Sequence, residues 1–404
     1  MNNKLVSDLT QCFLMQKKAD EAYGDVCAIL DNNLNNIDFD DDDDVKELFH
    51  IILRALDYRD NKSEFHGEIG IKLLEYLISK GFDVNFKLLK KECLILFLAK
   101  EQITPELFSR VVALGADVYS HNYWGDNVLT VTCGADFDST EALAIFIIEN
   151  YDLSVLNHPD RTGFTPLMYA VKHNRPRLAE ALINHGADVN EKGGESDCSP
   201  NGYGLSPFAL ACWDGNYDMA KMLSDAGADE LACDLNGTPA SFFLAYTPNG
   251  FSVKKGEIVS LLKNIEATDG NGNTLLLKAL AFNKYPLDKE VDPRFNPEVI
   301  KALIARGANV NAAGNDGRRP IHYAAKCYGD IYKELLAAGA DINAVDNDGN
   351  TALIIECLKS GEKKARMLLK KGADFSIRNN AGMTAADIAA AHGLEDVLEL
   401  MITD

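Results

Sequence analysis

Histidine and cysteine are the side chains through which this chain could act as a nucleophile or bind a transition metal. The sequence holds eight histidines and nine cysteines. The cysteines are irregularly spaced, without a CxxC or CxxxC pair, and most fall in apolar runs, where a thiol behaves as a small hydrophobic group. The histidines are scattered, and the patterns HExxH, GxSxG, GxxxxGKS and GxxxxGKT do not occur. We therefore expect no enzymatic activity, no cofactor and no metal site.

Two acidic phrases, Asp269–Asn273 and Asp346–Asn350, resemble the front half of a calcium-binding loop. A calcium loop of the EF-hand type needs a Glu at its twelfth position, which binds the ion with both carboxylate oxygens. The twelfth positions here hold Leu280 and Cys357. Both phrases also fall in register with the turns of a repeating pattern, so we expect turns rather than calcium sites.

The repeating pattern is clearest between Gly339 and Thr384. The phrase Gly339–Asn343 returns 33 residues later as Gly372–Phe375, and Asp348–Thr351 returns after the same step as Ala381–Thr384. A fixed period of this length indicates stacked helical units, each one packed on its neighbours. The elements that position any functional side chain should therefore be copies of one unit.

Each unit has a start marker and an end marker. The start is a Thr or Ser followed by Pro or a small residue, as at Thr165–Pro166 and Ser206–Pro207. The hydroxyl can cap a helix, and Pro fits the first helical position. The end is a Gly after an apolar helix, which we expect to be a left-handed C-cap. The end markers stand at Gly81, Gly115, Gly186, Gly227, Gly307, Gly339 and Gly372.

These alternating phrases resemble the ankyrin repeat, with TPLxxA-like starts such as Thr165–Ala170 and GADVN-like ends such as Gly186–Asn190. The resemblance implies an all-α, ankyrin-type helical repeat solenoid with short β-hairpin fingers, in about ten or eleven units. It also implies that His322 bonds to the backbone and to the next unit's turn. We expect an eroded capping unit over residues 1–40, divergent repeats over 41–159, and clear repeats with a C-terminal cap over 160–404.

Several stretches depart from the period. Extra residues occur at Asp57–Gly67, Glu191–Gly204, Tyr246–Gly256 and Asn283–Pro297. They form either a second contact surface or loops that are tolerated because added loop length costs little stability. The acidic run Asp40–Asp44 is either a solvated helix start or a site for a cation or basic peptide.

The net charge of −21 argues against binding to nucleic acid or to an anionic membrane surface. It favours a protein partner with a basic face. No apolar run approaches the ~20 residues that a membrane helix needs, and the N-terminus shows no signal-peptide pattern. Together with the unpaired cysteines, these features predict a cytoplasmic monomer.

Partner contacts in ankyrin arrays most often lie on the concave face, at positions that flank the finger glycine or follow the first helix. Interface hot spots are enriched in Trp, Tyr and Arg, and both tryptophans of this chain fall on such positions. Repeats stacked about 10 Å apart would place the aromatic side chains in one strip. The alternative is that these aromatics only pack finger on finger. The predicted partner-binding residues are Tyr123, Trp124, Asp126, Arg161, Phe164, Lys172, Tyr203, Leu205, Trp213 and Asp214.

The sequence thus predicts a non-enzymatic scaffold for protein–protein interaction, with the partner on the concave face. Three other readings stay open. One is an effector that acts inside a host cell, and another is an immunity or inhibitor protein for a basic toxin or enzyme. The third is a subunit that targets a separately encoded enzyme.

Overall fold

The computed structural model describes residues 24–25, 28–29, 32, 52, 65–87, 93–101, 103–135, 138–151, 154–193, 204–246, 254–281, 296–324 and 331–402. The chain divides into two compact units, residues 1–202 and residues 203–404, which are called unit 1 and unit 2 below. Each is described by itself.

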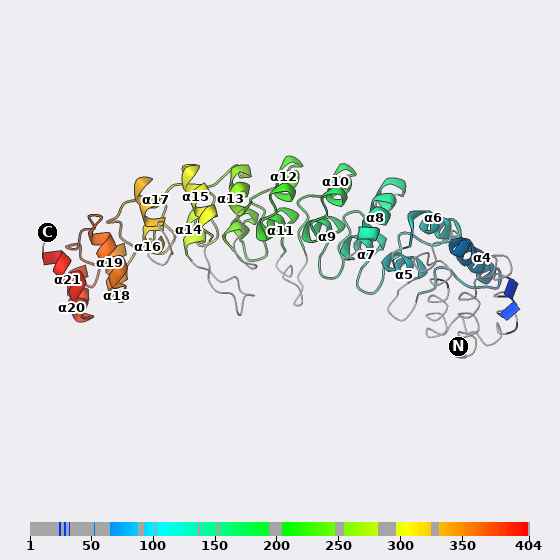
Figure 1. The fold of residues 1–404 in the computed structure, drawn as a ribbon, viewed down its shortest axis with the longest axis horizontal. Helices are drawn as coiled ribbons and strands as arrows, with labels where there is room; N and C mark the ends of the chain where they lie inside the picture. The colour runs from blue at the N-terminus through cyan, green and yellow to red at the C-terminus, as the bar shows by residue number, and fades with distance from the viewer. Residues whose placement is uncertain are drawn as a thin grey trace. The chain divides into compact units, whose positions relative to one another are not determined.

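Unit 1 is a stack of helix pairs. Its helices are α4 (Phe65–Ser79), α5 (Leu94–Lys100), α6 (Pro105–Ala113), α7 (Val128–Gly134), α8 (Asp138–Asn150), α9 (Pro166–Lys172) and α10 (Pro176–Asn184). The first helices of the pairs, α5, α7 and α9, form one row, and the second helices, α6, α8 and α10, form another (Figure 1). The core lies between the two rows.

Unit 2 repeats the same arrangement. Its helices are α11 (Pro207–Asp214), α12 (Tyr217–Asp225), η2 (Ala240–Ala245), α13 (Lys254–Ile258), η3 (Val259–Leu261), α14 (Leu275–Leu280), α15 (Pro297–Ala305), α16 (Pro320–Ala324), α17 (Ile331–Ala337), α18 (Ala352–Leu358), α19 (Glu362–Leu369), α20 (Ala385–Ala391) and α21 (Glu395–Ile402). In one repeat a 3-10 helix, η2, takes the place of the first α-helix. The all-α repeat architecture expected from the sequence is confirmed.

The residues predicted to start and end the helices have the expected capping roles. The side chain of Thr165 accepts a hydrogen bond from the Met168 N–H, and Ser206 does the same for Ala209. The end glycines of the repeats all have φ between 82° and 102°, in the left-handed region that favours glycine. The N-cap and C-cap predictions are therefore confirmed.

The turns between repeats, called fingers, are closed by an acidic or amide side chain. Asp346 Oδ1 accepts from the N–H groups of Asp348 (3.0 Å) and Asn350 (2.9 Å), and Asp269 closes the earlier calcium-like phrase in the same way. These carboxylates are used within their own turns. Among the described residues, no group of three or more His, Cys, Asp or Glu could hold a metal ion. The hairpin bases of three fingers are single antiparallel bridges at Cys233–Pro239, Thr268–Thr274 and Val345–Thr351.

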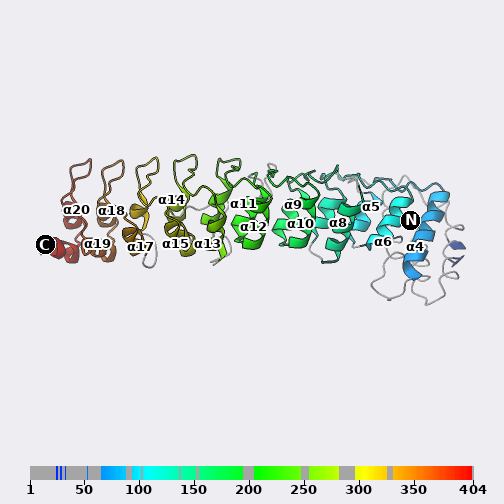
Figure 2. The same cartoon turned by 90° about the horizontal axis from the view of Figure 1, so that it is seen from above.

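Successive fingers of unit 2 are joined to each other through their backbones. Seen from above, they project as narrow hairpins beside α14, α18 and α20 (Figure 2). In each case a carbonyl of one finger accepts the N–H of the next finger. The donor and acceptor pairs are Asn315 to Asn271 (3.1 Å), Asn347 to Asp316 (3.1 Å) and Asn380 to Asp348 (2.9 Å).

The replacement Gly317→Ala should break this finger ladder. Gly317 has φ 74°, and a Cβ there would lie 2.7 Å from the Asn347 nitrogen that bonds the preceding finger. We expect a loss of about 2 kcal/mol in the free energy of unfolding, from backbone strain plus this clash. Gly339→Ala is the matched control, because φ is 90° and nothing lies within 4 Å. Urea titration should show a clearly smaller loss for the control; equal losses would mean that only backbone strain matters.

A second ladder joins the turns that end the repeats. In four cases an Asn side chain in the end turn of one repeat accepts an N–H from the corresponding turn of the next repeat. The pairs are Asn85 with Asp117 (2.8 Å) and Asn157 with Asp188 (2.8 Å) in unit 1, and Asn311 with Asp341 (2.9 Å) and Asn343 with Asp374 (2.8 Å) in unit 2. The recurring spacing of these Asn and Asp residues therefore has a direct structural use between repeats.

His322 fixes the start of α16 without taking the place of a Thr cap, because the N–H that a Thr would cap bonds the Arg319 carbonyl. The residue before α16 is Arg319, which cannot accept a hydrogen bond as the Thr caps do. His322 Nδ1 instead accepts from the Arg319 N–H (2.9 Å), so Nε2 carries the ring proton and donates to the Ala344 carbonyl (2.9 Å) in the next turn. The predicted structural role of His322 is confirmed.

Burial holds the pKa of His322 below its ordinary value of 6.5, although the Ala344 bond opposes that shift. The unfolded chain therefore takes up the proton first, and the stabilisation that His322 provides is complete above pH 6.5 and lost as the pH falls below it. We expect His322→Ala to lower the free energy of unfolding by about 2 kcal/mol at pH 7.5. The loss should shrink at pH 5, which urea titrations at both pH values can measure. A loss independent of pH would contradict this account.

Some predictions fall mainly outside the described residues. These are the capping unit over residues 1–40, the run Asp40–Asp44 and most of the four insertions. Two insertions end inside helices, because Gly67 lies in α4 and Gly256 lies in α13. A Cβ on Gly256 would lie 2.9 Å from the Glu298 carbonyl, so α13 packs closely against the start of α15.

Candidate partner-binding site on the fingers

Two neighbouring fingers of unit 1, residues 121–127 and 158–165, carry half of the predicted site. Asn122 Oδ1 closes the first finger by accepting the N–H groups of Trp124 and Asp126, both at 2.9 Å. Asp160 closes the second. The Arg161 N–H donates to the Trp124 carbonyl (2.6 Å), which fixes the two fingers in register.

This register brings three predicted residues together at the finger tips. Tyr123 is 50% exposed and Trp124 is 41% exposed, and their rings meet edge to face with centroids 6.1 Å apart. The Arg161 guanidinium lies 3.6 Å from the centroid of the Tyr123 ring, a cation–π contact. The tips therefore present two aromatic rings and a guanidinium in one fixed arrangement.

Phe164 lies beneath this arrangement, where a partner cannot reach it. It is 2% exposed, stacks on Tyr169 with centroids 4.8 Å apart, and lies under the ammonium of Lys172, 4.8 Å from its ring. Phe164 is thus a support and not a contact residue, whereas Lys172 is exposed. The reason is that Phe164 directly precedes the helix cap and points into the core, a direction that the finger register alone did not reveal.

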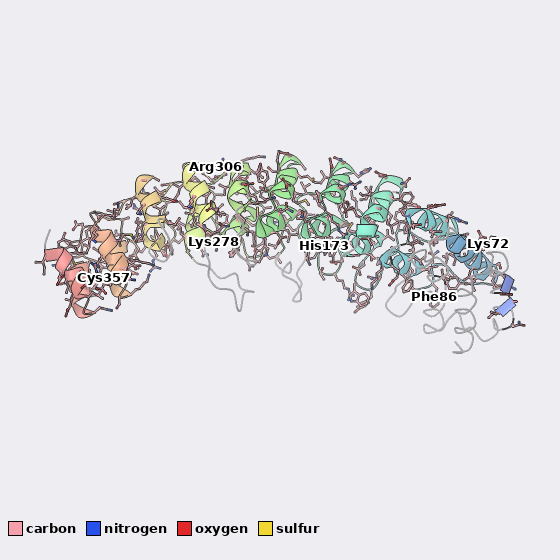
Figure 3. All side chains as sticks on the ribbon, viewed as in Figure 1. Lys72, Phe86, His173, Lys278, Arg306 and Cys357 are labelled. Atoms are coloured by element: carbon pink, nitrogen blue, oxygen red, sulfur yellow. The ribbon has the colours of Figure 1, made fainter. Side chains whose placement is uncertain are left out.

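Tyr169 and His173 also belong to this cluster, and the predicted set omits them. The Tyr169 hydroxyl donates to Asp160 Oδ2 (2.7 Å), and its ring stacks on His173 with centroids 6.1 Å apart. His173 ends α9 in the first-helix row (Figure 3). The signal for Tyr169 was its place four residues after the cap Thr165, on the face of the helix that returns toward the finger.

Burial and hydrogen bonding act in opposite directions on the pKa of Asp126. Burial raises its pKa above the ordinary value; a hydrogen bond from Asn122 (2.8 Å) opposes the rise, and the nearby Asp160 carboxylate adds to it. The side chain is half-buried. Below, the finger face of unit 1 means residues 121–127 and 158–165 together with the ends of α5, α7 and α9.

Four of the ten predicted residues belong to unit 2. Tyr203 lies outside the described residues, and Leu205 is 2% exposed and buried in the core, so it cannot contact a partner. Trp213 is half-buried and packs on the following repeat, with ring centroids 5.7 Å from Tyr246 and 5.8 Å from Phe243. Asp214 is exposed. Much of the Trp213 ring is therefore used for packing between repeats, as in the alternative in which the aromatic side chains only pack on one another.

Unit 2 also has an interior with several polar anchors. Arg306, at the end of α15, donates to the carbonyls of Val259 and Leu262, which close η3. Lys278, on α14, pairs with Asp269 at 3.4 Å, and both side chains are largely buried (Figure 3). Lys255 is 2% exposed and donates to the Tyr246 carbonyl; burial lowers its pKa to about 8. Lys255 and Lys278 are thus held within the repeat stack, whereas Arg306 is exposed and reaches back to η3.

Stacked helix pairs joined by fingers define a helical repeat solenoid, a class whose surfaces bind other proteins. The family model for ankyrin repeats in three copies matches the chain five times, over residues 95–193, 135–234, 251–346, 290–379 and 327–404. The chain therefore belongs to the ankyrin-repeat family. Ankyrin repeats are general modules of protein–protein interaction. In the described part of the chain, no helix is long and apolar enough to cross a membrane.

The relatives share the repeats and differ in length. Human inversin is 32% identical over 190 residues, which are 46% of this chain and 15% of inversin. Human ankyrin repeat and SOCS box protein 6 is 30% identical over 158 residues, 37% of this chain and 36% of that protein. The solved ankyrin repeat domain of Bcl-3 has a TM-score of 0.48 at 23% identity and covers 59% of this chain and 99% of its own. The chain thus spans about a third or less of the two sequence relatives.

Proposed function

We propose that this protein is a non-enzymatic scaffold that binds a protein partner through the finger face of unit 1. The contact residues are Tyr123, Trp124, Asp126, Arg161 and Lys172. One observation carries the proposal: two exposed aromatic rings and a guanidinium are held together on adjacent fingers whose backbones are joined.

This arrangement has the properties of an interface hot spot. Large aromatic rings and Arg supply most of the binding energy at typical protein interfaces. The closed fingers and the Arg161–Trp124 backbone bond hold these side chains in place before a partner binds. Binding therefore costs little conformational entropy. Buried Phe164 supports the tips from below.

We assign the predicted residues of unit 2 a lesser part. Asp214 is accessible to a partner, and Trp213 offers one half-exposed edge while it packs on Tyr246. Leu205 supports the core. The unpaired buried thiols, among them Cys133 and Cys212, support a reducing compartment such as the cytoplasm.

The double replacement Tyr123→Ala with Trp124→Ala should abolish partner capture without unfolding the chain. Both rings are exposed tips, so far-UV circular dichroism should be unchanged while captured partner falls at least tenfold. The measurement is affinity capture from a lysate of the source cell, quantified by mass spectrometry.

Tyr119→Ala is the matched control. Tyr119 is 44% exposed in the turn before the first finger and has no place in the cluster. Capture that survives the double replacement, or that falls equally with the control, would contradict the proposal. A loss of helical signal in the double variant would assign the rings to packing instead.

A further inference from the structure

The charges on the finger face of unit 1 differ from those of the whole chain. Three cations are exposed there: Lys100 ends α5, Lys172 ends α9, and Arg161 stands at a finger tip. Within the described residues, no carboxylate lies within ion-pair distance of any of the three. Lys100 still acts on the Asp126 carboxylate, whose pKa it lowers, but none of the three is held in an ion pair that an outside anion would have to break.

The carboxylates on the same face are partly or wholly buried. Asp160 is buried and accepts from the Thr162 N–H and hydroxyl, from the Phe164 N–H and from the Tyr169 hydroxyl. Asp126 is half-buried and bonded by Asn122, and Glu101, which follows α5, is also half-buried. Among the described residues of unit 1, the exposed acids lie elsewhere, on α4, in the end turns and on second helices, at Glu75, Asp83, Glu106, Asp117, Glu149, Glu180 and Asp188.

Between the two lysines, the middle helix of the row ends in a residue without a side chain. The position at the end of α7 that corresponds to Lys100 and Lys172 is Gly134, and a Cβ there would lie 3.2 Å from the Tyr169 ring. First helices in neighbouring repeats pack about 8–10 Å apart, so the two lysines stand roughly 20 Å from each other along the row. An extended segment covers that span with about six residues, at about 3.3 Å each.

We propose that the finger face of unit 1 binds an extended acidic segment of the partner protein, an inference that rests on the proposed function. Carboxylates of the segment pair with Lys100, Arg161 and Lys172, and its apolar side chains lie on Tyr123, Trp124 and the Gly134–Tyr169 surface. The Arg161 guanidinium lies 3.6 Å from the centre of the Tyr123 ring, and a guanidinium can take a carboxylate with two parallel hydrogen bonds.

The net charge of −21 does not oppose this assignment at contact distance. At physiological ionic strength the screening length is about 8 Å, so the distant acids of the end turns and second helices are largely screened. The cations on the face act at 3–4 Å and are not screened in this way. The net negative charge of the chain influences which proteins approach it from a distance. The local positive charges on the face select the segment that binds there.

The test is selection of a naive display library of random twelve-residue peptides on the full-length chain at 0.15 M salt. Selection is repeated on the Tyr123→Ala and Trp124→Ala double variant and on the Arg161→Glu and Lys172→Glu double variant. The matched control is Arg177→Glu, an exposed cation on α10, outside the face. We expect peptides rich in Asp and Glu that need both aromatic rings. The charge reversal should weaken their binding at least tenfold in fluorescence anisotropy, and the control should leave it unchanged.

The outcomes separate this inference from the proposed function. Peptides that need Tyr123 and Trp124 but are neutral or basic, or that survive the charge reversal, overturn the acidic segment and leave the proposed function standing. A weakening by Arg177→Glu as large as that by the charge reversal also overturns it, because the effect then comes from net charge. Peptides that bind the Tyr123→Ala and Trp124→Ala double variant as well as the wild type overturn both the acidic segment and the proposed function.

Discussion

Replacing Arg175 with Ala is expected to destabilise unit 1 by about 4 kcal/mol. Arg175 precedes α10, is buried, and donates through its guanidinium to the carbonyls of Thr132 (3.4 Å), Cys133 (3.3 Å) and Ala135. These carbonyls close α7 in the preceding repeat and, as the last carbonyls of a helix, have no partner within it. In the variant, each of the three carbonyls loses a charged hydrogen-bond donor. A buried polar group left without a partner lowers the free energy of unfolding by about 1–3 kcal/mol.

Cys133 provides a local measure of this loss, because its thiol is buried in α7 and burial raises its pKa to about 12. The thiol can react with an alkylating reagent only when the helix opens. Since each 1.4 kcal/mol is a factor of ten, Arg175→Ala should raise the labelling rate of Cys133 about 1,000-fold. Mass spectrometry of the digested protein gives the rate for each cysteine.

Three comparisons make the result specific. Cys357, a buried thiol on α18 in unit 2, should keep its labelling rate (Figure 3). Arg177→Ala, an exposed arginine two residues away, should change neither rate. Arg175→Lys keeps the positive charge but loses the several N–H donors of the guanidinium. Its Cys133 labelling rate should lie between those of the wild type and Arg175→Ala. An unchanged Cys133 rate in Arg175→Ala would show that water replaces the guanidinium at little cost.

Glu230→Ala is expected to cost unit 2 about 3 kcal/mol. The buried Glu230 carboxylate accepts from the Lys263 N–H (2.7 Å to Oε2) and from the Asn264 N–H (2.6 Å). That turn lacks the glycine that ends most other repeats. The turn is therefore held from one side by Glu230 and from the other by Arg306. Charge-assisted hydrogen bonds of this kind contribute about 1.5–3 kcal/mol each.

The matched control is Glu266→Ala. Glu266 makes the same kind of bond to the following repeat, with the Asn309 N–H (2.8 Å), but it is exposed and takes a single donor. We expect a loss below about 1 kcal/mol for the control. Urea titration measures both losses, and amide hydrogen exchange at Lys263 and Asn264 should accelerate only in Glu230→Ala. Equal losses would show that burial of the carboxylate adds nothing.

Much of the fold could be predicted because it depends on neighbours in sequence. A hydroxyl such as Thr165 caps the helix that follows it directly, and a glycine such as Gly186 adopts the left-handed conformation within its own turn. Arg175 and Glu230 could not be assigned in this way. Their partners lie 40–43 and 33–34 residues away, in the next or preceding repeat, and no local pattern marks the pair.

The candidate site shows the same division. The sequence register placed Tyr123, Trp124 and Arg161 on fingers, and the structure brings them together. Burial of Phe164 and Leu205 was missed because a register gives the position along the finger but not the direction of the side chain. For Trp213 the sequence left packing and partner contact as alternatives, and the structure shows it packed on Tyr246, which follows the 3-10 helix η2.

The finger ladder of unit 2 has an evolutionary consequence. Each finger takes its backbone bonds from its immediate neighbours, through Asn315, Asn347 and Asn380, so a duplicated repeat inserted in the row would find the same donors and acceptors on both sides. The tip side chains take no part in those backbone bonds. Copies of one repeat can therefore accumulate and diverge in what they recognise, while the array that carries them keeps its geometry.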